Sequence, residues 1–328
     1  MEATQFPADI ITEILSRLPV KPLVRFKCVS KSWFSLISST EFINTHLNLS
    51  SNKVDSQHVI IMDELVDESG DFELGYKECP VTSLFVDSVT EALDLDVDPS
   101  SQLYPTGSCN GLIFLSRDSS EFSLIWNPTI RKHKTLTMIK PKWKQYQYRC
   151  VFGFGYDELH NDYKVVVITY HYIICCSDDI DVKLYSLKSD SWTSVDYCDD
   201  TYFIRNCAYD CCETLFDRGS FVHGKLHWTT STLGLDSKVF QNKNIIAFDL
   251  ANEKWEKVEK PSYGIGETEL RVSKLGNDLS VFCDYETTHI GAWVMKEYGV
   301  KESWMKMFTV RDGHKTGKNN QSENHTWC

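Results

Sequence analysis

The residues of this 328-residue chain best suited to metal chemistry are the thiols and imidazoles of one short stretch. They are Cys198, Cys207, Cys211, Cys212, His223 and His227. Zinc sites draw such ligands from close pairs, but no two of the twelve cysteines have the CxxC spacing, and His227 falls in a strand-like run, GKLHW at 224–228. We therefore expect no metal site and reduced cysteines that pack as small apolar residues. A stand-alone metalloprotein is the alternative.

A second candidate site is a basic and aromatic loop between residues 127 and 151, which contains no acidic residue. Interleaved cations and rings can bind an acidic protein partner or single-stranded RNA. The alternative is a solvated loop whose charge is balanced by the acidic stretch 48–104 of the same chain. The residues that we predict to contact a substrate are Arg131, Lys132, Lys140, Lys142, Trp143, Lys144, Tyr146 and Arg149.

Signals for an active site are weak. Gly153 and Gly155 lack the third glycine and the following helix of a dinucleotide-binding loop, and there is no P-loop motif. Acidic pairs such as Asp63 and Glu64 lie among other charges, without an apolar pocket that would raise a carboxyl pKa. We predict a protein that is not an enzyme and needs no cofactor.

The net charge of -12 is unevenly distributed. Residues 1–47 carry five basic and four acidic residues, residues 48–104 carry two and thirteen, and residues 105–328 carry twenty-seven and twenty-nine. The acidic stretch would repel phosphate, so we expect no nucleic-acid partner. No apolar run approaches the roughly 18 residues of a membrane span, and the start lacks a signal peptide's basic residues. The expected location is the cytoplasm or the nucleus, without membrane contact.

The first 47 residues have the apolar spacing of helices. One stripe consists of Ile10, Ile11, Ile14, Leu15 and Leu18. Pro19 ends this helix; a second is predicted over 21–29 and a third from Ser30 or Ser32, with Trp33, Leu36 and Ile37 buried. Three short helices cannot enclose so many large apolar side chains, so an interface remains, either with another protein or with the rest of this chain.

Two consecutive segments, FPADIITEILSRLP at 6–19 and VKPLVRFKCVSKSW at 20–33, closely resemble an F-box, although a phenylalanine begins the motif where the family usually has leucine. The resemblance implies a helical module that docks on the Skp adaptor of a Skp-cullin-F-box ubiquitin ligase. Some of the matching residues must form the module's own core. The residues predicted on this basis to bind the adaptor are Phe6, Pro7, Ile11, Leu15, Leu18, Pro19, Leu23, Val29 and Trp33.

After residue 48 the pattern becomes strand-like and repeats. VKLYSLKSDSW at 182–192 and IIAFDLANEKW at 245–255 align with each other, and each is typical of a hairpin whose second strand begins at Trp. Weaker copies begin at Ser123 and Ile290. Further strand-like runs precede the copies at 111–115, 163–170, 224–229 and 279–283. Four such units predict a kelch-type β-propeller, with a β-sandwich as the alternative.

These repeats also contain family motifs, in order GSCNGLI at 107–113, WNPTIRK at 126–132, FGFGYD at 152–157, GSFVHGKLHW at 219–228 and WVMKEYGVKESW at 293–304. They resemble the F-box-associated interaction domain of plant F-box proteins, a group with kelch-repeat-like members and the S-locus F-box proteins of pollen. Function varies within the group, so the resemblance does not name a substrate or a pathway.

The expected organisation is α+β in separate domains. It comprises a three-helix F-box at 1–47, an acidic connector and first strands at 48–104, the β-propeller-like domain at 105–310 and a disordered polar tail at 311–328. Relatives usually continue through further strands, so we expect a propeller that is incomplete at its C-terminus.

The predicted function is that of a substrate-recognition subunit, whose helices bind a Skp-type adaptor, and through it a cullin, while the β domain recruits an unknown protein for ubiquitination. One alternative is a shortened protein that binds adaptor without a target. The other is an RNA-binding module that uses the loop at 131–149.

Overall fold

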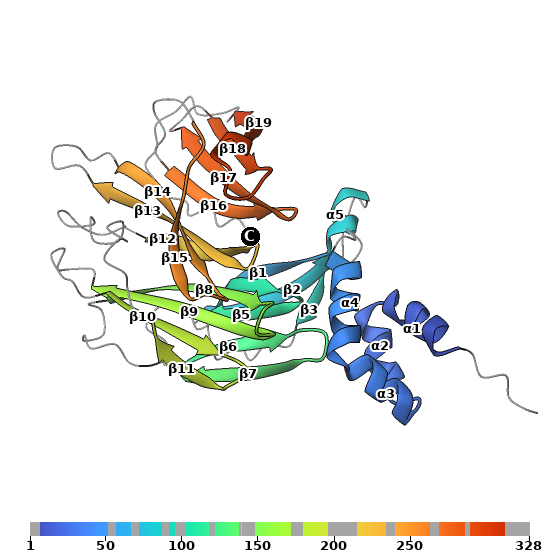
Figure 1. Cartoon of the computed structure of the whole chain (residues 1–328). Helices are drawn as coiled ribbons and strands as arrows, with labels where there is room; N and C mark the ends of the chain where they lie inside the picture. The colour runs from blue at the N-terminus through green and yellow to red at the C-terminus, as the bar shows by residue number, and fades with distance from the viewer. Residues whose placement is uncertain are drawn as a thin grey trace, which may run out of the picture.

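The computed structural model describes residues 7–51, 57–66, 72–86, 92–95, 103–117, 122–137, 139, 148–171, 180–195, 215–233, 240–262, 269–285 and 289–311. A group of short helices lies at the lower right of Figure 1, and strands make up most of the other described residues. This arrangement confirms the predicted class, a helical module followed by an all-β, propeller-like domain. Within the described ranges, no helix has the length and apolar character that a membrane crossing requires. The predicted tail lies outside these ranges from residue 312 onward.

The helical module consists of α1 (Ala8–Ser16), α2 (Val20–Phe26), α3 (Lys31–Ser38) and α4 (Thr40–Ser51). Pro19 lies between the first two helices as predicted, because its ring and missing N–H disfavour continuation of a helix. Ser30 caps α3, since its hydroxyl oxygen accepts a hydrogen bond from the backbone N–H of Trp33 at 3.2 Å. The prediction of three helices over 1–47 is wrong in number, because the structure has a fourth helix, α4, that continues to Ser51. It was missed because apolar residues are sparse and weakly periodic in this segment.

The core of this module is small. Four apolar side chains are buried in it, Leu15, Leu23, Ile37 and Phe42. Each stabilises the module by roughly 1.5–3 kcal/mol through removal of apolar surface from water. The helix α4 is joined to the turn after α1 by the Nε2 atom of His46, which lies 2.8 Å from the backbone oxygen of Leu18.

The β domain begins with a three-stranded sheet, β1 (His58–Val66), β2 (Phe72–Pro80) and β3 (Leu93–Leu95), with α5 (Val81–Val86) after β2. Blade 1 contains β4 (Tyr104–Cys109), β5 (Leu112–Ser116), β6 (Phe122–Asn127) and β7 (Lys132–Thr137). Blade 2 contains β8 (Tyr148–Asp157), β9 (Asp162–His171), β10 (Ile180–Ser186) and β11 (Ser191–Ser194).

Blade 3 contains β12 (Leu215–Val222), β13 (Lys225–Leu233), β14 (Phe240–Asp249) and β15 (Lys254–Val258). Blade 4 contains β16 (Glu269–Leu275), β17 (Asp278–Tyr285), β18 (His289–Met295) and β19 (Trp304–Arg311), with the short 3-10 helix η3 (Lys301–Ser303) before β19. Strands within each blade pair antiparallel in chain order, and a single parallel pairing of Gly153 with Gly219 joins blades 2 and 3.

The predicted repeat corresponds to these blades. Tyr185 pairs with Trp192 and Phe248 pairs with Trp255, at ring-centroid distances of 5.1 and 4.8 Å. The weaker copies are the hairpins β6–β7 and β18–β19, and the runs predicted before each copy are β5, β9, β13 and β17. The predicted strand-like runs do not include the first strand of each blade, β4, β8, β12 and β16.

An apolar cluster fills the space between each pair of consecutive sheets. From the three-stranded sheet to blade 4, buried members from both sides are Tyr76 with Trp126, Phe114 with Phe154, Ile168 with Trp228 and Ala247 with Val281. In Figure 1 the sheets fan around a common centre in this order. Stacked sheets with interdigitated side chains account for the stability of the domain.

Glycines allow the first strands of the blades to approach one another closely. A Cβ atom on Gly153 or on Gly219 would lie 2.6 Å from the indole of Trp228, and one on Gly155 would lie 2.3 Å from the ring of Phe221. Both glycines of the FGFGYD motif lie within β8. Their small size is required for ring packing at the junction of blades 2 and 3.

In each blade, the turn between the first and second strands and the turn between the third and fourth strands lie at the same edge, because the strands alternate in direction. Six non-glycine residues in the turns of blades 1–3 have φ between 50° and 55°; they are Asn110, Arg131, Asn161, Asp190, His223 and Glu253. Asn and Asp tolerate this left-handed conformation better than most residues. We call this edge of the β domain the tight-turn end.

Candidate functional site

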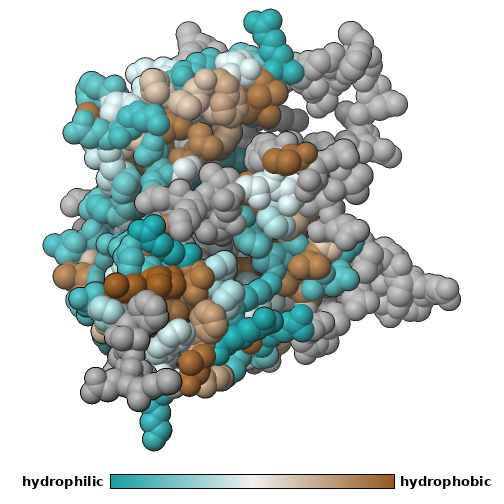
Figure 2. All heavy atoms as spheres, turned by 90° about the vertical axis from the view of Figure 1, so that its right-hand side faces the viewer, coloured by the Kyte–Doolittle hydropathy of each residue, from teal (hydrophilic) through white to brown (hydrophobic). Residues whose placement is uncertain are grey.

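The surface of the helical module carries an unusual number of exposed apolar side chains. Ile10, Ile14 and Phe34 are 47%, 55% and 55% exposed, and Val29 is 59% exposed. Val20, Val24, Ile43 and Leu49 are exposed as well. Figure 2, which looks at the helical side of the molecule, shows brown patches of this kind at the height of the helices in Figure 1. Apolar side chains that the module leaves in water are typical of a protein-binding surface.

Basic residues are frequent in the same helices as these apolar side chains. Between residues 14 and 40 the chain has five basic residues and no acidic one; they are Arg17, Lys21, Arg25, Lys27 and Lys31. The ammonium of Lys27 lies 6.0 Å from the centroid of the Phe34 ring, a cation–π distance. The arrangement therefore suits a partner with an apolar groove and acidic surroundings.

The nine residues predicted to bind an adaptor fall into separate environments. Leu15 and Leu23 are buried inside the module, and Ile11, Leu18 and Trp33 are half-buried against the same core. The exposed members are Pro7, Pro19 and Val29, and Phe6 lies outside the described residues. The predicted set omits the exposed residues Ile10, Ile14, Val20 and Val24. Helical spacing could have identified them, because Ile10 and Ile14 lie one turn apart beside the core positions of α1, and Val20 and Val24 lie one turn apart in α2.

The predicted basic and aromatic loop is only partly described. Lys140, Lys142, Trp143, Lys144 and Tyr146 lie outside the described residues. Arg131 and Lys132 are exposed at the tight-turn end where β7 begins, whereas Arg149 is exposed near the start of β8. The six residues of β7 span about 20 Å, so these two groups of cations lie at opposite ends of their blades.

The histidines of the predicted cysteine and histidine cluster are described, and its cysteines at 198, 207, 211 and 212 are not. His227 is buried, with Nδ1 3.1 Å from the carbonyl oxygen of Ser220 and Nε2 2.8 Å from the hydroxyl of Tyr298. A carbonyl oxygen only accepts, so Nδ1–H donates to Ser220 and Nε2 accepts from Tyr298. Both ring nitrogens are thus used within the protein. Among the described residues, no group of histidine, cysteine and acidic side chains suits a metal ion.

Burial also determines the ionisation of this pair. Burial, with smaller effects of the charges of Lys225 and His223, lowers the pKa of His227 from 6.5 to about 4. Burial raises the pKa of the Tyr298 hydroxyl. At neutral pH the imidazole and the phenol are both neutral, and they join blade 3 to the turn before β19.

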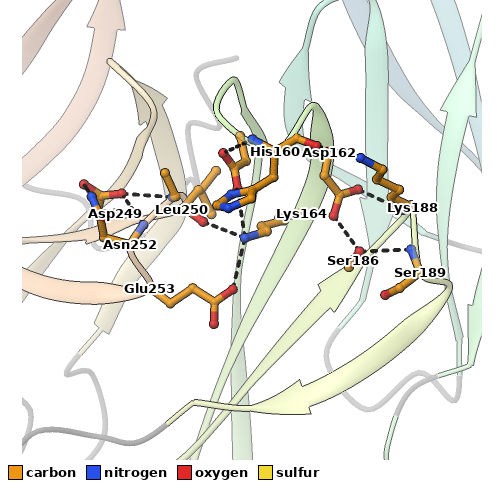
Figure 3. Close-up of polar contacts among 12 residues, drawn as sticks. His160, Asp162, Lys164, Ser186, Lys188, Ser189, Asp249, Leu250, Asn252 and Glu253 are labelled. Carbon is orange, nitrogen blue, oxygen red and sulfur yellow. Dashed lines mark hydrogen bonds and ion pairs between the residues drawn. The ribbon is translucent and has the colours of Figure 1, made fainter.

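A buried ionic network joins blades 2 and 3 at the tight-turn end (Figure 3). The ammonium of Lys164 lies 3.0 Å from a carboxylate oxygen of Asp157 and 3.0 Å from one of Glu253, and it donates a 2.7 Å hydrogen bond to the backbone oxygen of Leu250. Asp157 also accepts from the backbone N–H of His160 at 3.1 Å. Every polar partner here belongs to the chain itself.

The pKa shifts of this network follow from its pairing. Burial would raise the pKa of Asp157, but hydrogen bonds from Lys164 and His160 outweigh it and lower this pKa. Burial would lower the pKa of Lys164, but its bonds to Asp157 and Glu253 raise it. The pairing favours the charged forms of Asp157 and Lys164, so we assign the network the role of holding the blades together.

Comparison with known proteins agrees with this geometry. The family model of the F-box associated beta propeller domain matches residues 71–325, and that of the F-box domain matches residues 4–45. The chain is an F-box protein with an F-box associated β-propeller domain. The F-box match coincides with the helical module, and the propeller match includes all four blades.

Relatives of this F-box protein occur in Arabidopsis thaliana. It is 30% identical to the F-box protein CPR1 over 321 residues, which cover 93% of this chain and 73% of that protein. It is 28% identical to an F-box/kelch-repeat protein, with 93% of this chain and 79% of that protein covered. Among solved structures it is similar to the β-propeller domain of the Trilobed protease from Pyrococcus furiosus, with 12% identity, 76% and 68% coverage and a TM-score of 0.38. That score is too low to support any statement about activity.

Proposed function

We propose that this F-box protein is a substrate-recognition subunit of a Skp-cullin-F-box ubiquitin ligase and acts in the cytoplasm or the nucleus. F-box proteins are in general non-catalytic, and an F-box domain generally implies a Skp-type adaptor as partner. The observation that carries the proposal is the exposed apolar and basic surface of the helices, which lies outside an intact core.

The proposed adaptor contacts are the exposed members of the predicted set, Pro7, Pro19 and Val29, together with Ile10, Ile14 and Phe34. Leu15 and Leu23 instead hold the helices together. This division follows from burial, since a side chain that is enclosed by its own domain offers no surface to a partner.

Co-purification with a tagged Skp-type adaptor tests the proposal. The double variant Ile14→Asp/Phe34→Asp places charges on the exposed surface without touching the core, and we expect it to bind adaptor at least about tenfold more weakly. Leu159→Asp is the matched control, because Leu159 is an equally apolar, exposed residue of the β8–β9 turn. Equal recovery of adaptor by the double variant and the control would overturn the proposal.

The β domain is proposed to hold the target protein. Its contribution is proximity, because tethering a target beside a charged ubiquitin-conjugating enzyme raises the effective concentration of its lysines. This role needs no cofactor. The double variant Ile14→Asp/Phe34→Asp should still bind a target but should not deliver it for ubiquitination. Proteins that bind the wild-type chain, and that accumulate only in cells with the double variant, are therefore the expected targets. If no protein accumulates, the chain binds adaptor without recruiting a target.

A further inference from the structure

The last strand of each blade is its outermost strand, and that of blade 4 differs from the others. The exposed side chains of β7, β11 and β15 are all polar or charged. In β19 the exposed side chains include Met305, Met307, Phe308 and Val310, each between 44% and 54% exposed. Figure 2 shows tan and brown side chains gathered at the top of the molecule, the height of blade 4 in Figure 1.

This strand is also longer than the other outermost strands. It has eight residues, whereas β7, β11 and β15 have six, four and five. Its outer edge has no neighbour among the described strands. Proteins normally keep edge strands short and polar, because a long apolar edge is a template for pairing with another chain.

The side chains of β19 form two rows of different chemistry. Met305, Phe308 and Val310 lie opposite Val294, Ala292 and Ile290 of β18, so they share one face of the blade. The ring of Phe308 lies 6.4 Å from that of Phe282 on the same face. The apolar cluster between blades 3 and 4 uses the other face of β17, at Val281 and Cys283. On this face Ala292 and Val294 of β18 are buried, whereas Met305, Phe308 and Val310 of the edge strand remain about half exposed.

The second row is basic. Lys306 and Arg311 lie opposite Trp293 and His289, on the face away from Phe308. The ammonium of Lys306 lies 5.9 Å from the centroid of the Trp293 ring, and neither cation forms an ion pair with a described residue. The segment 304–311 contains no acidic residue.

We propose that the outer edge of β19 binds an extended segment of another protein as an added strand, with apolar side chains on one face and aspartate or glutamate on the other. Backbone hydrogen bonds would supply affinity, and the two rows would supply selectivity. A second copy of the chain fits less well, because its β19 would place a basic row beside a basic row. That the strand belongs to a ubiquitination target rests on the proposed function; the strand-binding edge does not.

Fluorescence anisotropy with short labelled peptides tests this surface on the full chain. We expect a peptide that alternates Val and Glu to bind at least about tenfold more tightly than one that alternates Val and Lys. Phe308→Thr keeps strand propensity but removes the ring, and should weaken the Val and Glu peptide by about tenfold. Lys306→Glu/Arg311→Glu should reverse the preference between the two peptides.

The matched control is Lys254→Glu/Lys257→Glu, which makes the same charge change on the outermost strand of blade 3 and should leave the preference unchanged. Equal binding of both peptides, or a preference that survives the reversal on β19, would overturn the proposal. If sedimentation shows that the wild-type chain is a dimer and that Phe308→Thr is a monomer, the edge binds a second copy of the chain, and the proposal is overturned. Adaptor binding, tested separately with Ile14→Asp/Phe34→Asp, does not depend on this edge, so failure of one proposal is distinguishable from failure of the other.

Discussion

The helical module and the β domain place their large apolar side chains in opposite ways. The module buries Leu15, Leu23, Ile37 and Phe42 and leaves apolar residues such as Ile14 and Phe34 in water. The β domain fills the space between every pair of consecutive sheets and pairs its buried charges. A unit of about 40 residues has too little interior to enclose its apolar residues, whereas stacked sheets have enough. The module is thus suited to binding and the β domain to rigid support.

The largest expected effect is on the stability of the β domain. Trp228→Ala removes an indole that is 1% exposed and packs on Gly153 and Gly219, so we expect a loss of about 4 kcal/mol in the free energy of unfolding of the β domain. Urea denaturation followed by tryptophan fluorescence measures it. Binding of adaptor by the helices should persist under native conditions. Loss of both together would show that the two regions are not independent.

Lys164→Met tests the buried charges of the same region. Removal of the ammonium leaves Asp157 buried without its main partner, and we expect a cost of about 3–4 kcal/mol in thermal or urea denaturation. Lys296→Met breaks a partly exposed pair with Asp278 at the same 3.0 Å distance and should cost less than about 1 kcal/mol. Similar losses in the two variants would contradict the role given to burial.

In the module, two neighbouring residues of α1 separate core from surface. Leu15→Ala should cost about 3 kcal/mol of module stability because it leaves a cavity, whereas Ile14→Ala should change it by less than about 0.5 kcal/mol. Amide hydrogen exchange of α1 to α4 measures both, and added adaptor should restore protection in Leu15→Ala if binding is retained. Equal exchange in the two variants would remove the distinction between core and contact residues.

Acid is expected to weaken the junction of blades 3 and 4. The folded-state pKa of His227 is about 4 and its ordinary value is 6.5, so the neutral imidazole is favoured by folding. The contribution of the neutral imidazole to the free energy of unfolding is fully present above pH 6.5 and is lost as the pH falls from 6.5 to about 4. This loss is at most on the order of 3 kcal/mol. Denaturation midpoints across this range should fall less steeply in His227→Gln than in the wild type. His133→Gln, a change at an exposed histidine of β7 in blade 1, is the control.

Much of the architecture could be predicted because it is written in local patterns. The F-box motif is dense over 6–33, and the spacing of Tyr185 and Trp192 reflects a cross-strand pair within one hairpin. The first strand of each blade was missed because its own residues have a weak strand pattern. It becomes a strand through its pairing with the neighbouring strands. Gly153 and Gly219 belong to recognisable motifs, but their role in packing could not be predicted, since it depends on contact with the indole of Trp228.

The chain's sequence by itself determined the class of fold, the family, and the elements that have a strong local pattern, because period and motif are properties of short segments. Tertiary structure decided which apolar residues are exposed. It also brought Lys164 to Glu253, 89 positions away, and placed Lys132 and Arg149, both assigned to the predicted loop between residues 127 and 151, at opposite ends of β7 and β8. The physical reason is that burial and charge pairing depend on which segments lie next to one another in the folded chain. A local sequence pattern does not contain that information.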